Sequence, residues 1–270
     1  MRVAICQIPV SSQPDVNLRR IESALTSASE QASELAVFPE GSQVRFSADL
    51  RSAAEPLDGP FCTGLSKAAR NAGVALVAGM FETAPGDLVY NTTVAIDATG
   101  HLVAAYRKIH LFDALGQRES QTIAPGSELV VADLAGLKVG ILTCYDVRFP
   151  ELARALTLRG ADLIAIPSAW AAGLFKEEHW VTLVRARAIE NTIWVAAAGQ
   201  VPDQQEPPTR APTGVGRSLL VDPMGTARLD LGSSAGVSVG IVDTEMTAQV
   251  RSVLPCLEHR RPDLFAAVGA

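Results

Sequence analysis

The chain has 270 residues, of which 48% are hydrophobic and 19% are charged, and its formal net charge is −6. This acidic excess argues against a nucleic-acid-binding surface, which needs clustered basic residues. No apolar run approaches the roughly 20 residues of a membrane helix, and the apolar run at the N-terminus is too short for a signal peptide.

Short apolar runs rich in valine and isoleucine recur along the chain and predict strands. Continuous apolarity over such a length suits a strand that is buried on both faces. The runs cover residues 3–8, 35–38, 74–80, 92–96, 139–143, 163–166, 193–198, 218–221 and 237–242.

Helical spacing fills several of the intervals between these runs. Apolar residues three and four positions apart extend from Leu18 to Leu35, and Asp15 is positioned to cap this helix at its N-terminus. Similar patterns occur at residues 152–158 and 180–188. The alternation of strands and helices predicts an α/β fold.

Two segments of the same form predict hairpins. Residues 94–104 and 219–229 each contain a predicted strand, an Asp-x-x-Gly turn and a second strand, which hints at two similar halves. Residues 202–216 lack an apolar period and predict a long surface loop. No segment has the composition of a linker, so we expect residues 1–270 to form one domain.

The four cysteines stand alone in the sequence, with no paired spacing. We therefore expect neither a disulfide framework nor a zinc site, and we expect no metal or cofactor. A reducing cytoplasm is the default location for such a chain.

Three polar residues stand at or just beyond the ends of predicted strands. In open α/β sheets the ligand crevice lies beyond the carboxyl ends of the strands, so these three ends could converge on one site. The residues are Glu40, Lys108 and Cys144.

Cys144 is the predicted nucleophile. It precedes a helical stretch, and a cysteine on a sharp strand-to-helix turn exposes its sulfur. The next backbone N–H, that of Tyr145, would point to where an oxyanion forms, and the helix start would favour the thiolate. The alternative is a buried structural cysteine, and we keep that interpretation for Cys6, Cys62 and Cys256.

Glu40 and Lys108 supply complementary chemistry. A carboxylate beside a thiol can take the thiol proton and later activate water, and a fixed cation can stabilise a tetrahedral anion. Each residue is a weak signal alone, because most glutamates are solvated and a lysine commonly extends its ammonium into solvent. The position of Glu40 directly after a buried strand makes it unusual.

The segments around Glu40, Lys108 and Cys144, and three segments further along the chain, together form a recognisable set of motifs. They are residues 38–40, 106–112, 144–152, 179–180, 185–191 and 221–225. In their order and flanks they resemble the nitrilase superfamily of carbon–nitrogen hydrolases, and this resemblance covers nearly the whole chain.

The resemblance implies a four-layer α-β-β-α sandwich that pairs into a homodimer or a larger assembly. It also implies a Glu-Lys-Cys triad and a second glutamate, Glu119, that helps to position the triad and the substrate; an exposed loop carboxylate is the alternative for Glu119. The chain is most similar to the nitrilase-like amidases, which include deaminated glutathione amidase and omega-amidase, and the tail at residues 254–265 resembles the former. Residues 169–178, which precede His179 and Trp180, differ from the short threonine–glycine segment that these amidases have at the same place.

The amidase likeness predicts a small amide substrate that bears a carboxylate. In relatives acting on carboxylated amides an arginine after the cysteine can hold that carboxylate, and the planar fork of Arg148 suits this role. The alternative for Arg148 is an ion pair with Asp146 or Glu151. The predicted substrate contacts are Tyr145, Arg148, Trp170 and His179.

Other functions remain open. Cys144 could couple with a histidine, for which His110 and His179 are candidates. A non-catalytic binding protein could keep the same fold, although the intact Glu-Lys-Cys set speaks against it. An acyl transferase would use the same residues and pass the acyl group to an amine instead of water.

Overall fold

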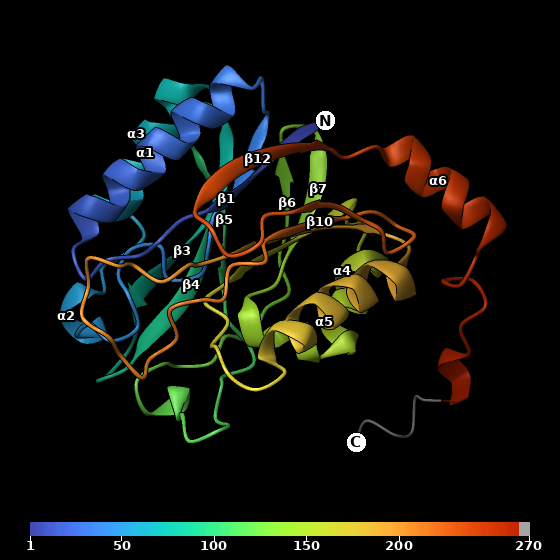
Figure 1. The fold of residues 1–270 in the computed structure, drawn as a ribbon. Coiled ribbons are helices and arrows are strands. Elements are labelled where there is room, and N and C mark those ends of the chain that lie inside the picture. Colours follow the sequence, from blue (N-terminus) through green and yellow to red (C-terminus); the bar gives the residue numbers. More distant parts are fainter. Residues whose placement is uncertain (265–270) are drawn as a thin grey trace.

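The computed structural model describes residues 1–264, which form two six-stranded sheets packed face to face, with helices on both outer faces (Figure 1). One cluster of buried apolar side chains lies between the sheets, and a further cluster lies between each sheet and its helices. The layers are therefore helix, sheet, sheet and helix, which confirms the predicted four-layer sandwich.

The first sheet combines three parallel strands, an antiparallel hairpin and an antiparallel edge strand. Its order is β12-β1-β2-β3-β4-β5, and β1, β2 and β3 are the parallel strands. The strands are β1 (Arg2–Gln7), β2 (Leu35–Val37), β3 (Ala75–Thr83), β4 (Val89–Ile96), β5 (Leu102–Arg107) and β12 (Gly236–Ile241).

The second sheet repeats this arrangement. Its order is β6-β7-β8-β9-β10-β11, with β7, β8 and β9 parallel and β10–β11 as the hairpin. The two predicted hairpins thus belong to two halves with the same strand order. The strands are β6 (Val131–Leu134), β7 (Leu137–Ile141), β8 (Leu163–Ser168), β9 (Trp194–Gly199), β10 (Leu219–Val221) and β11 (Ala227–Asp230).

Two helices cover each sheet. The apolar faces of α1 and α3 pack on the first sheet, and those of α4 and α5 pack on the second (Figure 1). The helices are α1 (Pro14–Glu30), α2 (Leu50–Ala53), α3 (Pro60–Ala72), α4 (Pro150–Leu158), α5 (Lys176–Asn191) and α6 (Thr244–Val253), with 3₁₀ turns η1 (Glu119–Gln121), η2 (Cys144–Arg148) and η3 (Pro262–Leu264).

The first helix differs from its prediction at both ends. Its N-cap is Gln13 and Pro14 is its first residue, so the prediction that Asp15 caps the helix was wrong. Proline is favoured at the first helical position, where its missing N–H costs nothing. The helix ends at Glu30, and Leu35 begins β2 instead of continuing the helical face.

The part of the chain that the structure describes, residues 1–264, meets neither the requirements of a membrane-spanning helix nor those of a metal site. No helix among them is long and apolar enough to cross a membrane, and no three His, Cys, Asp or Glu side chains are grouped to hold a metal ion. Phe265, the last residue of the tail segment with the amidase likeness, lies outside this range.

Candidate active site

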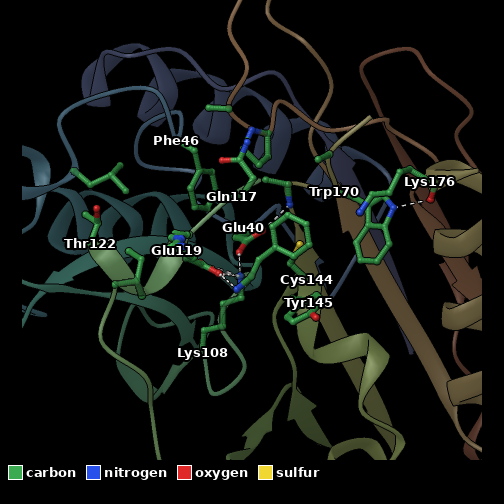
Figure 2. A pocket seen from close by; sticks show the side chains of 18 residues that line it. Glu40, Phe46, Lys108, Gln117, Glu119, Thr122, Cys144, Tyr145, Trp170 and Lys176 are labelled. Atoms are coloured by element: carbon green, nitrogen blue, oxygen red, sulfur yellow. Dashed lines mark hydrogen bonds and ion pairs between the residues drawn. The ribbon is translucent and has the colours of Figure 1, made fainter. Parts of the chain in front are cut away.

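Strand ends from both sheets meet at one site. Glu40 follows β2 and Lys108 follows β5, so both come from the first sheet, whereas Cys144 follows β7 of the second. Figure 2 shows the three side chains around one cavity. The structure therefore brings together the three residues that the sequence analysis singled out.

The Lys108 ammonium is buried between two carboxylates. Its Nζ lies 2.9 Å from Glu40 Oε1 and 2.8 Å from Glu119 Oε2, and only 2% of the side chain is exposed. Burial alone would lower the pKa of Lys108, but the charges of Glu119 and Glu40 outweigh it and hold this pKa well above its ordinary value. Lys108 is therefore a fixed cation at the centre of the site.

Glu119 is tied to this cation from the other side. Its Oε2 accepts a hydrogen bond from the Phe112 backbone N–H at 2.6 Å, and its Oε1 accepts from Lys108 at 2.9 Å and from Asn91 Nδ2 at 3.2 Å. The carboxylate is thus part of a hydrogen-bonded network and is not a solvated loop group.

Both carboxylate oxygens of Glu40 are held by hydrogen bonds. Asn91 Nδ2 donates to Oε1 at 2.8 Å, and the Ala169 backbone N–H donates to Oε2 at 2.8 Å. Gln200 Nε2 donates to the Glu40 backbone carbonyl at 2.6 Å. Because Ala169 and Gln200 directly follow β8 and β9, the second sheet orients a carboxylate that the first sheet supplies. The sequence analysis missed all three partners.

Cys144 lies on a strained turn. Its φ is 48°, in the left-handed region that non-glycine residues seldom adopt. Behind it, the buried Asp146 carboxylate accepts from the Thr143 backbone N–H at 3.0 Å and from Tyr106 Oη at 2.8 Å. These bonds fix the turn that carries Cys144 and Tyr145.

The surroundings of the Cys144 thiol favour its neutral form. Burial raises the pKa of Cys144 above its ordinary value, the charge of Glu40 raises it further, and Lys108 only partly opposes them. The expectation that the helix start favours the thiolate stays a prediction, and burial and Glu40 act in the opposite direction. A neutral thiol needs a base, and Glu40 is the carboxylate beside it.

A cavity with a volume of about 200 Å³ opens onto the sulfur. Tyr145 and Trp170, two of the four predicted substrate contacts, line it together with Glu40, Lys108 and Glu119. The sequence analysis did not single out several other lining residues. Among them are Phe46, Phe112, Arg118, Lys176, Ala211 and Pro212.

The carbon–nitrogen hydrolase family matches residues 2–252. The chain belongs to this family. Hydrolase Rv0480c of Mycobacterium tuberculosis is 39% identical over 268 residues, which cover 96% of this chain and 95% of that protein. Deaminated glutathione amidase of Escherichia coli O157:H7 is 35% identical over 266 residues, which cover 97% of each. The predicted membership of the nitrilase superfamily of carbon–nitrogen hydrolases is confirmed.

A solved structure of an amidase from Nesterenkonia sp. AN1 is similar as well. It is 28% identical, has a TM-score of 0.83, and the match covers 98% of this chain and 95% of that one. In that structure, a glutamate-to-glutamine mutant, the acetamide moiety of fluoroacetamide is covalently added at the active-site cysteine.

Two predicted substrate contacts of this carbon–nitrogen hydrolase lie elsewhere. Neither Arg148 nor His179 is among the residues that line the cavity. The Arg148 guanidinium lies over the Trp170 ring, 4.8 Å from its centroid, and 3.5 Å from His179 Nδ1. The Arg148 guanidinium, which was predicted to bind the substrate carboxylate, therefore lies against the Trp170 indole. The alternative prediction, an ion pair of Arg148 with Asp146 or Glu151, does not form either.

The histidines also bear on the Cys-His alternative. His110 Nδ1 lies 2.8 Å from Asp146 Oδ1, and its ring stacks on Phe149 with centroids 3.6 Å apart. His179 is exposed. Since neither ring lines the cavity of the hydrolase, no observation favours a histidine as partner of Cys144.

The predicted long loop reaches the cavity, because Ala211 and Pro212 line it. Glu206 ties this loop to the body of the hydrolase: it accepts from the Ser12 backbone N–H at 2.7 Å and from Ser11 Oγ at 2.8 Å, and pairs with Arg45 at 2.9 Å. These bonds, led by the one from Ser12, lower the pKa of Glu206 to about 2.

Glu206→Gln should lower the melting temperature at about pH 7 by roughly 3 °C, the shift for about 1 kcal/mol in a chain of this size. A carboxyl whose pKa falls on folding stabilises the fold above its unfolded pKa of about 4.3 and loses this contribution as the pH falls toward its folded value. Calorimetry should therefore show the difference shrinking between about pH 5 and pH 3. Glu22→Gln on α1 is the control, and a difference that is constant with pH would contradict the assignment.

Proposed function

We propose that the protein hydrolyses an amide bond of a small, carboxylate-bearing molecule through a thioester on Cys144. The observation that carries this proposal is the buried Lys108 ammonium between Glu40 and Glu119, in the lining of the same cavity as Cys144. The cavity volume of about 200 Å³ favours a small molecule over a protein chain.

The first half of the reaction forms the thioester. Glu40 takes the thiol proton of Cys144 as the sulfur attacks the amide carbon. The carbonyl oxygen becomes an anion, which Lys108 and the Tyr145 N–H stabilise. Lys108 Nζ contacts three carboxylate oxygens, Glu40 Oε1 and both oxygens of Glu119. An ammonium has three N–H donors, so one reaches the anion when a single N–H is shared between the two Glu119 oxygens. Collapse breaks the C–N bond, and the protonated Glu40 gives its proton to the leaving amine or ammonia.

The second half hydrolyses the thioester. Glu40 takes a proton from a water molecule, whose oxygen attacks the thioester carbon, and the same cation and N–H stabilise the second tetrahedral anion. The C–S bond then breaks, Glu40 returns the proton to the sulfur, and the carboxylic acid leaves. Glu119 keeps Lys108 in place throughout.

A substrate panel tests the proposal. The purified protein is incubated with small amides, nitriles and carbamoyl compounds while ammonia release and intact protein mass are followed. We expect ammonia from amides and an acyl adduct on the peptide that contains Cys144. If added amines divert the acyl group and water does not compete, the protein is an acyl transferase instead. A panel with neither ammonia nor an adduct would contradict the function itself.

We place the protein in a reducing cytoplasm. Within residues 1–264 the four cysteines are all free thiols. Cys6 and Cys62 are buried, and burial, followed by the charge of Glu55, raises the pKa of Cys62 to about 11. Neither of these buried thiols lines the cavity, whereas Cys144 does, and this access to a substrate distinguishes Cys144 from them.

We also propose a homodimer or larger assembly through the outer faces of α4 and α5. Leu158 of α4 is 53% exposed. Ile189 of α5 is 45% exposed and lies against Gly225, which follows the exposed Met224 in the sequence. Exposed large apolar side chains that gather on one face mark interaction surfaces. The helix α6, whose Val253 is 81% exposed, projects from the same side of the sandwich (Figure 1).

Light scattering at micromolar concentration should give a mass of at least two 28.5 kDa chains. Leu158→Asp with Ile189→Asp should shift this mass to one chain, because a buried unpaired charge opposes association. Ser23→Asp on α1, on the opposite helical layer, is the matched control. A single-chain mass for the wild type would remove the proposal, and a double variant that stays assembled would move the interface elsewhere.

A further inference from the structure

Lys176 is a buried cation inside the active-site cavity that the proposed chemistry does not use. It is the first residue of α5, it lines the cavity, and only 6% of it is exposed. Its Nζ makes no ion pair or hydrogen bond with residues 1–264. A lysine side chain this little exposed is usually paired, and here the unpaired Nζ borders the open space of the cavity.

Two aromatic rings hold the ammonium in place of a carboxylate. Nζ lies 4.3 Å from the centroid of the Trp170 ring and 5.0 Å from that of the Phe112 ring, and both rings line the cavity. The Trp170 ring is itself fixed, because its Nε1 donates to the Lys176 backbone carbonyl at 2.6 Å. Cation–π contacts position an ammonium without consuming its N–H donors, so all three remain available to a ligand.

The charges around the cavity separate into two regions. Glu40 and Glu119 give the region around Lys108 one more negative than positive charge, so a substrate carboxylate would be repelled there. Figure 2 shows Trp170 and Lys176 on the other side of Cys144 from Glu119. Arg118, the other cation of the lining outside the region around Lys108, is exposed to solvent, whereas Lys176 is not. The charges therefore favour an anionic substrate that points its carboxylate to the Lys176 side while its amide reaches the sulfur.

We propose that Lys176 is the specificity-determining residue that binds the carboxylate of the substrate, in place of Arg148. Arg148 lies against the same Trp170 ring but outside the cavity lining, so it adds positive potential without direct contact. Burial, and then the charge of Arg148, lower the pKa of Lys176, which an anionic ligand would reverse. This inference rests on the proposed amide hydrolysis.

The kinetic test compares two amides of similar length, anionic succinamate and neutral butanamide. Lys176→Met should raise KM for succinamate roughly 10- to 100-fold, the range for a hydrogen bond to a charged group, and leave the KM for butanamide within about twofold. Lys176→Arg should restore most of the succinamate affinity. Lys67→Met, an exposed lysine on α3, is the matched control.

A binding test needs no turnover. Succinate should slow the alkylation of Cys144 by iodoacetamide in the wild type and in Lys67→Met, but not in Lys176→Met, as followed on the Cys144 peptide by mass spectrometry. Equal losses for both amides in Lys176→Met, or an equal effect of Arg118→Met, a solvent-exposed cation at the cavity, would overturn the inference. If the wild type hydrolyses butanamide without any preference that depends on Lys176, only the inference fails; if it hydrolyses no amide of the panel, the proposed function fails with it.

Discussion

Replacement of Cys144 by alanine should abolish hydrolysis while leaving the fold intact. We expect kcat to fall by about four orders of magnitude or more, the scale on which loss of a nucleophile acts in enzymes with a covalent intermediate. The change deletes one sulfur atom, and alanine suits the turn at least as well as cysteine does, so the melting temperature should stay within a few degrees. Ammonia release from the best amide of the panel and the mass of the trapped adduct are the measurements.

A second cysteine supplies the control for this experiment. Cys256 is partly exposed, and its sulfur contacts the Glu190 backbone carbonyl at 3.7 Å, far along the chain from the site. Cys256→Ala should keep full activity and remain sensitive to iodoacetamide, whereas Cys144→Ala should show no alkylation-dependent loss. Activity near the wild-type level in Cys144→Ala would show that another group attacks the substrate.

The sequence predicted the reacting residues because they follow strands. The carboxyl ends of parallel strands lie at the same edge of a sheet. A polar residue that directly follows a buried strand is therefore expected at this edge, where ligands bind. Glu40 and Cys144 both follow this rule, and Lys108 follows a strand of the attached hairpin. The partners of Glu40 escaped prediction for a different reason: Ala169 contributes only a backbone N–H, and Asn91 lies within a strand where polarity carries no local signal.

The substrate side of the cavity was the least predictable part. Whether Arg148 or Lys176 faces the ligand depends on how α5 is rotated and on where the Trp170 ring lies, and these are set by packing between segments far apart in sequence. The departure of residues 169–178 from related amidases did mark this region. It did not show that the departure places a lysine in the cavity.

Among the helices, α3 could have been located and was not. Pro60 is its first residue and Gly73 ends it with a φ of 65°, which are the usual start and stop signals of a helix. Its buried residues Phe61, Leu65 and Ala68 also follow helical spacing. The short strand β6 offers no comparable signal, because it lies at the edge of its sheet and only part of it is buried.

Glu40→Gln and Lys108→Met should each reduce kcat by several orders of magnitude, and the double variant should be little worse than either. The base and the oxyanion cation act in the same step as Cys144, and residues that act as one unit show strongly non-additive losses. If each single change costs roughly 10³-fold, the pair should cost well under the 10⁶-fold of independent residues. Single-turnover rates of thioester formation with the same amide would measure this.

The melting temperatures of these variants show whether a loss of activity comes from a missing catalytic group or from unfolding. Lys108→Met leaves the carboxylates of Glu40 and Glu119 buried without their cation, and breaking a buried ion pair in this way costs about 3–5 kcal/mol. Adding Glu40→Gln removes one of the two stranded charges, so the double variant should melt above Lys108→Met alone. Lys138→Met is the control, since Lys138 pairs with Asp133 and both side chains are exposed, 55% and 82%. Losses in kcat that multiply in the double variant, with both single variants fully folded, would place Glu40 or Lys108 outside the chemical step.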